Sequence, residues 1–161
     1  MSCNTAHAWH AELQGRHPGM TLLHIGDATA DYLLGQGETE VGLLSTAGTV
    51  KSGVYAEALA RVGIACREPN EEELDLVMRG IYDGVKAGDN ELGRACFASA
   101  LLRMRRRTGV TGFLMACTEI PLALRTADVP AECRLYDPGR LSARELAWRA
   151  LAGWLPARFC S

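Results

Sequence analysis

The sequence predicts an α/β protein built around a parallel sheet. Short apolar runs alternate along the chain with segments of helical periodicity, which is the pattern of strands joined by crossover helices. Most of these runs are apolar throughout, as expected for a sheet that helices cover on both faces. The expected strands are residues 21–26, 41–46, 63–68, 110–116 and the more polar 133–136.

The segment 70–88 has the clearest helix boundaries. Asn70 can serve as the N-cap, and Glu73 stands three residues later, where it completes a variant of the capping box. Gly88 can end the helix. Apolar residues recur between them at helical spacing, namely Leu74, Met78, Ile81 and Val85.

The remaining helices are expected from similar signals. Residues 52–63 and 91–109 each have helical periodicity and end at a glycine. Ser142 and Glu145 have capping-box spacing, so they predict the start of a last helix over 142–155.

The composition places the chain among ordinary globular proteins and excludes several classes. The 161 residues suit one domain, and 48% are hydrophobic, which is enough for a buried core. A formal net charge of −2 favours neither a nucleic acid nor a membrane surface as partner. No secretory signal is recognised at the N-terminus, and no apolar run could cross a bilayer. The six cysteines include no C-x-x-C pair, which predicts reduced thiols in a cytoplasmic protein.

The stretch "LLSTAGTVKSG" joins a predicted strand to a helix. It offers four hydroxyl groups and the free amides of a helix N-terminus, which can bind an anion. The Walker phosphate-loop pattern is absent, since Thr49 follows Gly48. A capped turn without a ligand is the favoured interpretation, with an anion site as the alternative. The hydroxyl groups belong to Ser45, Thr46, Thr49 and Ser52.

The N-terminal stretch "CNTAHAWH" allows a metal site as a minor alternative. Cys3, His7 and His10 have C-x₃-H-x₂-H spacing and would share one face of a helix. A closed site needs a fourth ligand, which His17, His24 or another cysteine would have to supply. A polar helix start without a metal is the favoured interpretation.

Two cysteines differ from the other four in their surroundings. Cys3 and Cys117 each lie next to a threonine in a polar turn, and Cys117 follows the apolar strand 110–116. Ligands bind at the carboxyl edge of open α/β sheets, and a cysteine near a helix N-terminus ionises more readily. The other cysteines are expected to be small buried or bystander residues.

Four blocks of the sequence resemble, in order, the aspartate/glutamate racemase superfamily. They are "CNTAH" (3–7), "LLSTAGTVKSGVY" (43–55), "VMRGIYDGVKAGDNELGR" (77–94) and "ACTEIPL" (116–122). Within the superfamily, the chain most resembles the cofactor-independent aspartate racemases. The resemblance implies a fold of two pseudo-symmetric α/β lobes with the site between them, commonly assembled as a homodimer.

The resemblance also implies how the chain divides. Members of the superfamily carry a further segment ahead of the first Cys-Asn-Thr, so the first lobe is expected to be incomplete. Residues 1–19 would be a remnant of that lobe with the first cysteine motif, and residues 20–135 the second, three-layer lobe. Residues 136–161 would form a C-terminal helix that packs back on the first lobe.

The implied activity is cofactor-independent racemisation of aspartate or glutamate, without pyridoxal phosphate or a metal ion. Cys3 and Cys117 match the two cysteines that exchange a proton with opposite faces of the α-carbon. Glu119 follows the second cysteine in a role that stays open. The residues that match substrate-binding positions are Asn4, Thr5, Ala6, Thr46, Thr49, Lys86 and Thr118.

Two further functions remain open from the sequence. A truncated chain could bind an acidic amino acid without turning it over. The same scaffold could also racemise or isomerise another acidic substrate.

Overall fold

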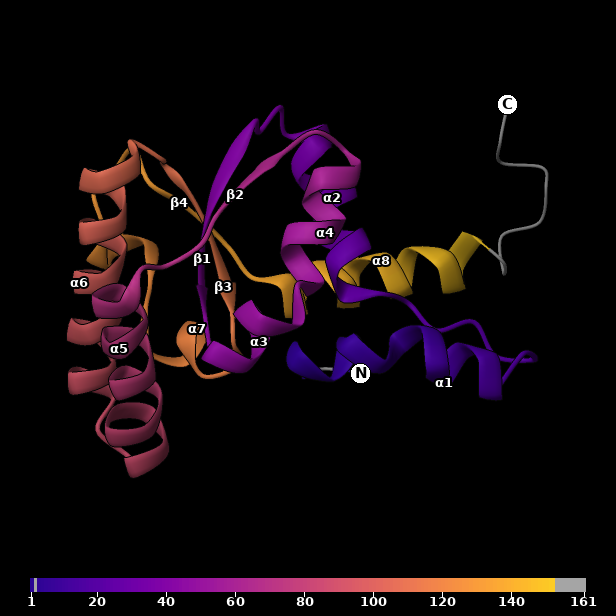
Figure 1. The fold of residues 1–161 in the computed structure, drawn as a ribbon, viewed down its shortest axis with the longest axis horizontal. Helices are drawn as coiled ribbons and strands as arrows, with labels where there is room; N and C mark the ends of the chain where they lie inside the picture. The colour runs from indigo at the N-terminus through magenta and orange to yellow at the C-terminus, as the bar shows by residue number, and fades with distance from the viewer. Residues whose placement is uncertain (2, 153–161) are drawn as a thin grey trace.

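A computed structural model describes residue 1 and residues 3–152. Its centre is a parallel four-stranded sheet in the order β2-β1-β3-β4 (Figure 1). The sheet confirms four of the five expected strands and the α/β class. The strands are β1 (Glu40–Ser45), β2 (Ala65–Arg67), β3 (Gly112–Ala116) and β4 (Arg134–Tyr136).

Helices cover both faces of this sheet, which makes three layers (Figure 1). One apolar cluster joins a face of the sheet to α5 and α6, and the other joins the opposite face to α2 and α4. Within the described chain no helix is both long and apolar enough to span a bilayer. The α-helices are α1 (His10–Arg16), α2 (Ile25–Gly35), α3 (Ala47–Ser52), α4 (Val54–Arg61), α5 (Glu71–Arg79), α6 (Asn90–Thr108), α7 (Ile120–Ala123) and α8 (Pro138–Ala152). Shorter helical turns are η1 (Thr5–Trp9), η2 (Gly80–Gly84), η3 (Val85–Ala87) and η4 (Thr126–Asp128).

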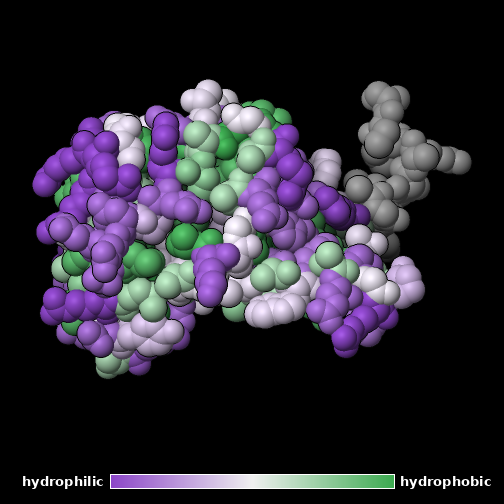
Figure 2. Space-filling model, viewed as in Figure 1, coloured by the Kyte–Doolittle hydropathy of each residue, from purple (hydrophilic) through white to green (hydrophobic). Residues whose placement is uncertain are grey.

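Two arms extend from the same side of the sheet in Figure 1, the N-terminal η1–α1 segment and α8. The α8 helix packs against α2. Large apolar side chains are exposed on α8, namely Leu146, Trp148 and Leu151. On the opposite side of the molecule, hydrophilic side chains cover much of α5 and α6 (Figure 2).

The expected strand 21–26 is wrong. Its last two residues begin α2 instead, because the Nδ1 atom of His24 accepts a hydrogen bond from the backbone N–H of Asp27 and caps the helix. Ile25, which the sequence predicts as part of a strand, is fully buried in the core from the first turn of α2.

The expected helix 70–88 is correct at its start and wrong in its second half. The Asn70–Glu73 capping box is present, with both hydrogen bonds at 2.9 Å. After α5 the chain widens into the π-helical turn η2 and ends in η3. A Cβ atom on Gly84 would lie 2.7 Å from the backbone of Gly93, so this turn packs directly on the α6 backbone.

The helix expected over 52–63 is two helices. Thr46 caps α3, which therefore begins five residues early, and Gly53, with φ of +69°, separates α3 from α4. By contrast, α6 confirms the helix expected over 91–109, and it ends at Gly109 with φ of +80°.

The capping box expected at Ser142 and Glu145 is wrong. The last helix, α8, begins at Pro138, and the Asp137 carboxylate accepts hydrogen bonds from the N–H groups of Gly139 and Arg140. Ser142 therefore lies inside the helix. The expected helix end at 155, as well as Cys160, lies outside the described residues.

Candidate functional site

Several residues of the candidate site lie at the carboxyl edge of the two central strands. Ser45 of β1 pairs in register with Ala116 of β3. The residues that follow, Thr46 and Cys117, therefore leave the sheet on neighbouring strands, which lie about 4.8 Å apart in a sheet. This edge is where open parallel sheets bind ligands.

Three threonine hydroxyl groups are connected at the end of β1. Thr46 caps α3 by accepting a hydrogen bond from the Thr49 N–H, and their hydroxyl oxygens lie 3.1 Å apart. The Thr5 hydroxyl lies 2.7 Å from that of Thr49. The N-terminal Cys-Asn-Thr motif is thus attached directly to the strand–helix turn, and the expected cap of this turn is present.

A buried tyrosine holds the neighbouring asparagine. The Tyr55 hydroxyl donates a hydrogen bond to Oδ1 of Asn4, and both side chains are buried. Burial raises the pKa of Tyr55 well above its ordinary value, and the nearby Asp137 and Cys117 raise it further. Tyr55 therefore attaches the N-terminal motif to α4. No local sequence signal marks Tyr55 as a functional residue, although it lies in one of the four matching blocks.

The Cys117 thiol is hydrogen-bonded to Glu119. Its Sγ atom donates to Oε2 of Glu119 at 2.9 Å, and the Thr118 hydroxyl donates to the same oxygen at 2.9 Å. Lys86 Nζ lies 3.8 Å from the other carboxylate oxygen. Burial and the bond to Glu119 raise the pKa of Cys117 to about 12. Burial opposes ionisation of Glu119, yet the hydrogen bonds from Cys117 and Thr118 hold its pKa below the ordinary value.

The first cysteine stands apart from this network. Cys3 is exposed and precedes η1, and no hydrogen bond within the described residues involves its side chain. Ala6 is half-buried in η1, and Thr118 is exposed. The structure thus brings Asn4, Thr5, Thr46 and Thr49 into one connected group. It brings Lys86, Cys117 and Thr118 into a second group through Glu119.

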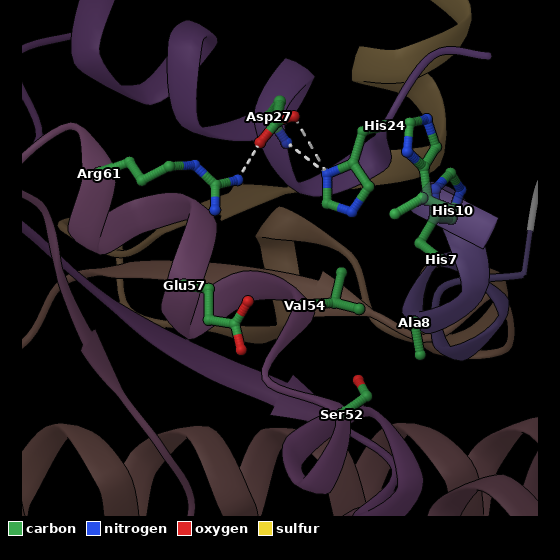
Figure 3. Close-up of a pocket in the computed structure, with 10 residues that line it drawn as sticks. His7, Ala8, His10, His24, Asp27, Ser52, Val54, Glu57 and Arg61 are labelled. Carbon is green, nitrogen blue, oxygen red and sulfur yellow. Dashed lines mark hydrogen bonds and ion pairs between the residues drawn. The ribbon is translucent and has the colours of Figure 1, made fainter. Parts of the chain in front are cut away.

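A separate hollow of about 260 Å³ lies beside η1, between α2 and α4 (Figure 3). His7, His10 and His24 form one wall, with ring centroids 4.9 to 6.2 Å apart. An ion pair between Asp27 and Arg61 forms another part of the wall, and Glu57 faces the histidines across the hollow (Figure 3).

The histidine nitrogens are largely occupied by the protein itself. His7 Nδ1 accepts from the Ile25 N–H at 3.2 Å, its Nε2 donates to the Met1 carbonyl at 3.2 Å, and His10 Nε2 donates to the Leu22 carbonyl at 2.7 Å. Among the residues that the structure describes, no group of His, Cys, Asp or Glu is arranged to hold a metal ion. The metal alternative built on Cys3, His7 and His10 therefore finds no support, and the histidines instead attach η1 to the start of α2.

Known proteins resemble this fold and sequence. An aspartate racemase homologue from Pyrococcus horikoshii OT3 superposes with a TM-score of 0.80 at 28% identity, over 92% of this chain and 64% of that chain. The Picrophilus torridus aspartate racemase gives a TM-score of 0.72 at 30% identity, over 93% and 61%. A glutamate racemase of Pseudomonas paraeruginosa (strain DSM 24068 / PA7) is 28% identical over 150 residues, which are 91% of this chain and 55% of that protein.

These relatives are longer than this chain, which spans 55% to 64% of their length. Their fold confirms the expected racemase-type α/β architecture. The profile of the family described as Asp/Glu/Hydantoin racemase matches residues 1–146. The chain therefore belongs to the Asp/Glu/hydantoin racemase family.

Proposed function

We propose that the chain racemises an acidic amino acid, with aspartate as the first substrate to test and without a cofactor. The observation that carries the proposal is the position of Cys117. Its thiol lies at the carboxyl edge of the sheet, beside a lysine and next to the turn that holds Thr46 and Thr49. A thiol that can exchange a proton, a cation and hydroxyl groups at one strand end suit proton transfer at a carbon beside a carboxylate.

The proposed reaction moves one proton in each direction. The Cys3 thiolate takes the α-proton from one face of the amino acid, and the C–H electron pair stays on the α-carbon and the adjoining carboxylate. The Cys117 thiol then gives its proton to the opposite face, so that Cys3 ends as a thiol and Cys117 as a thiolate. The reverse direction exchanges the two roles.

The binding groups follow from the two connected sets of side chains. Lys86 is half-exposed, and its Nζ atom lies 3.8 Å from the Glu119 carboxylate that holds Cys117. Because part of its side chain is accessible, its ammonium group can pair with a substrate carboxylate. One side of the proposed substrate site is formed by the N-terminal residues Asn4, Thr5 and Ala6. The other side is formed by residues that follow the strand ends, namely Thr46, Thr49 and Thr118. Hydroxyl and amide groups there would bind the α-amino and carboxylate groups. Charge that develops on the carboxylate during deprotonation is stabilised by the same donors.

Exchange of the α-proton tests this proposal. The protein is incubated in deuterated water with L-aspartate or D-aspartate, without added cofactor, and loss of the α-proton is followed by NMR. We expect exchange in the native chain and its loss in both Cys3→Ala and Cys117→Ala. Cys66→Ala is the matched control, since Cys66 is a half-buried cysteine in β2, away from the carboxyl ends of β1 and β3.

A folded protein that exchanges neither enantiomer would contradict the proposal. Glutamate and other dicarboxylic amino acids in the same assay define the substrate. We also propose a homodimer in the cytoplasm, as the resemblance implies. Light scattering coupled to size-exclusion chromatography measures the mass in solution, and a mass of 17.4 kDa would contradict the dimer.

A further inference from the structure

Glu119 has three neighbours that compete for one carboxylate. Oε2 accepts from both the Cys117 thiol and the Thr118 hydroxyl at 2.9 Å, and Oε1 lies 3.8 Å from Lys86 Nζ. The Glu119 side chain is one-fifth exposed, so water screens these interactions only in part. Glu119 is thus placed to determine which of its neighbours carries a proton.

We propose that Glu119 is a positioning residue that keeps Cys117 in its thiol form, so that Cys117 enters the reaction as the proton donor and Cys3 as the base. This assignment rests on the proposed function and deepens it. Two cysteines in similar surroundings could start with either one as the thiol and the other as the thiolate. The Glu119 carboxylate lies beside Cys117 and not beside Cys3, so it favours the thiol form at Cys117.

The argument begins with the direction of the hydrogen bond. The hydrogen bonds that Glu119 accepts lower its pKa and favour its carboxylate form, and a carboxylate can only accept, so the contact at 2.9 Å places the proton on sulfur. Ionising Cys117 would break this bond and place two negative charges side by side in a half-buried turn. Burial of the sulfur makes the largest contribution to the pKa of Cys117, which rises to about 12, and the Glu119 carboxylate adds to it.

Charged groups from other elements also face Cys117. The positive charge of Lys86, which lies in η3, lowers the pKa of this thiol. Tyr55 of α4 is neutral across the physiological range because its pKa is raised well above the ordinary value. Glu119 and Lys86 therefore act on the same sulfur with opposite signs.

The consequence for the reaction is an ordered start. One enantiomer presents its α-proton to Cys3 and receives the Cys117 proton directly. The other enantiomer needs a Cys117 thiolate and a Cys3 thiol. The Cys117 thiol must therefore first pass its proton to Oε2 of Glu119, the acceptor already in hydrogen-bond contact, and the exposed Cys3 must take up a proton from water. A substrate carboxylate that draws Lys86 away would make Glu119 a better acceptor for that proton.

Alkylation of Cys117 as a function of pH tests the assignment without any measurement of catalysis. Iodoacetamide reacts with thiolates, and mass spectrometry of the Cys117 peptide gives the rate at each pH. We expect Glu119→Gln, which keeps an acceptor oxygen and removes the charge, to react at least about tenfold faster at pH 8. Lys86→Met removes the opposing cation, and its rate should fall by about two- to tenfold.

Glu91→Gln is the matched control, because Glu91 is an exposed carboxylate paired with Arg94 on α6. It should leave the Cys117 profile unchanged, and the Cys66 peptide in the same digests provides an internal reference. A Cys117 profile that is unchanged or moves to higher pH in Glu119→Gln would overturn the assignment. If that variant does not fold, a faster or unchanged rate in Lys86→Met overturns it instead. The deuterium-exchange assay on the native chain reports separately on racemisation.

Discussion

The hydroxyl groups of Thr5 and Thr49 lie 2.7 Å apart, although 44 residues separate them along the chain. Together with the bond from Tyr55 to Asn4, this contact attaches the N-terminal motif to the β1–α3 turn. The first two matching blocks of the sequence therefore meet in space at one edge of the sheet. The predictions below test the contacts that hold this edge in place.

Removing the Tyr55 hydroxyl should weaken the edge directly. Tyr55→Phe leaves the buried Oδ1 of Asn4 without its donor, which costs about 1–3 kcal/mol in the free energy of unfolding. The rate of α-proton exchange should also fall, because Asn4 is proposed to contact substrate. Tyr32→Phe is the control, since the Tyr32 hydroxyl has no hydrogen bond within the described residues. Equal stability of the two variants in urea unfolding would contradict the prediction.

The π-helical turn should not tolerate a side chain at Gly84. A Cβ atom there would lie 2.7 Å from Cα and N of Gly93, and this contact is backbone on both sides. Gly84→Ala should therefore cost about 1–3 kcal/mol in stability. It should also weaken substrate binding, because Lys86 follows two residues later. Gly15→Ala is the control, because a Cβ atom on Gly15 would meet no atom within 4 Å, so this substitution should not lower stability. Thermal unfolding of both variants measures the difference.

The pairing of Glu73 with Arg107 should be a strong stabilising contact. The Glu73 side chain is 1% exposed, accepts two hydrogen bonds from Arg107 at 2.6 and 3.0 Å, and completes the capping box of α5. Glu73→Ala should cost about 2–3 kcal/mol, since it removes both hydrogen bonds from Arg107 and the acceptor of the Asn70 N–H. The neighbouring Glu72 is 76% exposed with Arg103 as partner, so Glu72→Ala should change stability by less than about 1 kcal/mol. Comparable losses in chemical denaturation would refute this ranking.

The attachment of η1 to α2 should weaken in acid. Burial lowers the pKa of His7 below its ordinary value of 6.5, and the positive charges that His24, His10 and the N-terminal amino group can carry lower it further. The unfolded chain then binds more protons than the folded one. Stability is therefore complete above about pH 6.5 and falls as the pH drops toward the folded-state pKa.

His7→Asn checks this pH dependence. The Asn oxygen can still accept from the Ile25 N–H but cannot take up a proton, so the slope of stability between pH 7.5 and 5.5 should become flatter. His17→Asn is the control, because His17 is exposed and should keep the native slope. Urea midpoints measured at each pH give the slopes. A His7→Asn slope equal to that of the native chain would rule out His7 as the source.

Local sequence signals predicted much of this protein. The apolar runs at 41–46 and 110–116 became the two central strands, and the Asn70–Glu73 pair became a capping box. Both signals act over a few residues, through a continuous apolar run that is buried on both faces of the sheet and through a side chain that bonds its own helix. The four blocks likewise pointed to the racemase family that the profile confirms.

The tertiary structure decided where these local signals ended and which side chains met. Ile25 is buried in the core from the first turn of a helix and not from the expected strand, and the backbone contact between Gly84 and Gly93 accompanies a π turn where a regular helix was expected. The partners of Asn4, Thr5 and Cys117 depend on strand register, burial and the path of the chain between β1 and β3. Periodicity and spacing carry no information about contacts across 44 or 51 residues, because these form only when the sheet and its covering helices assemble.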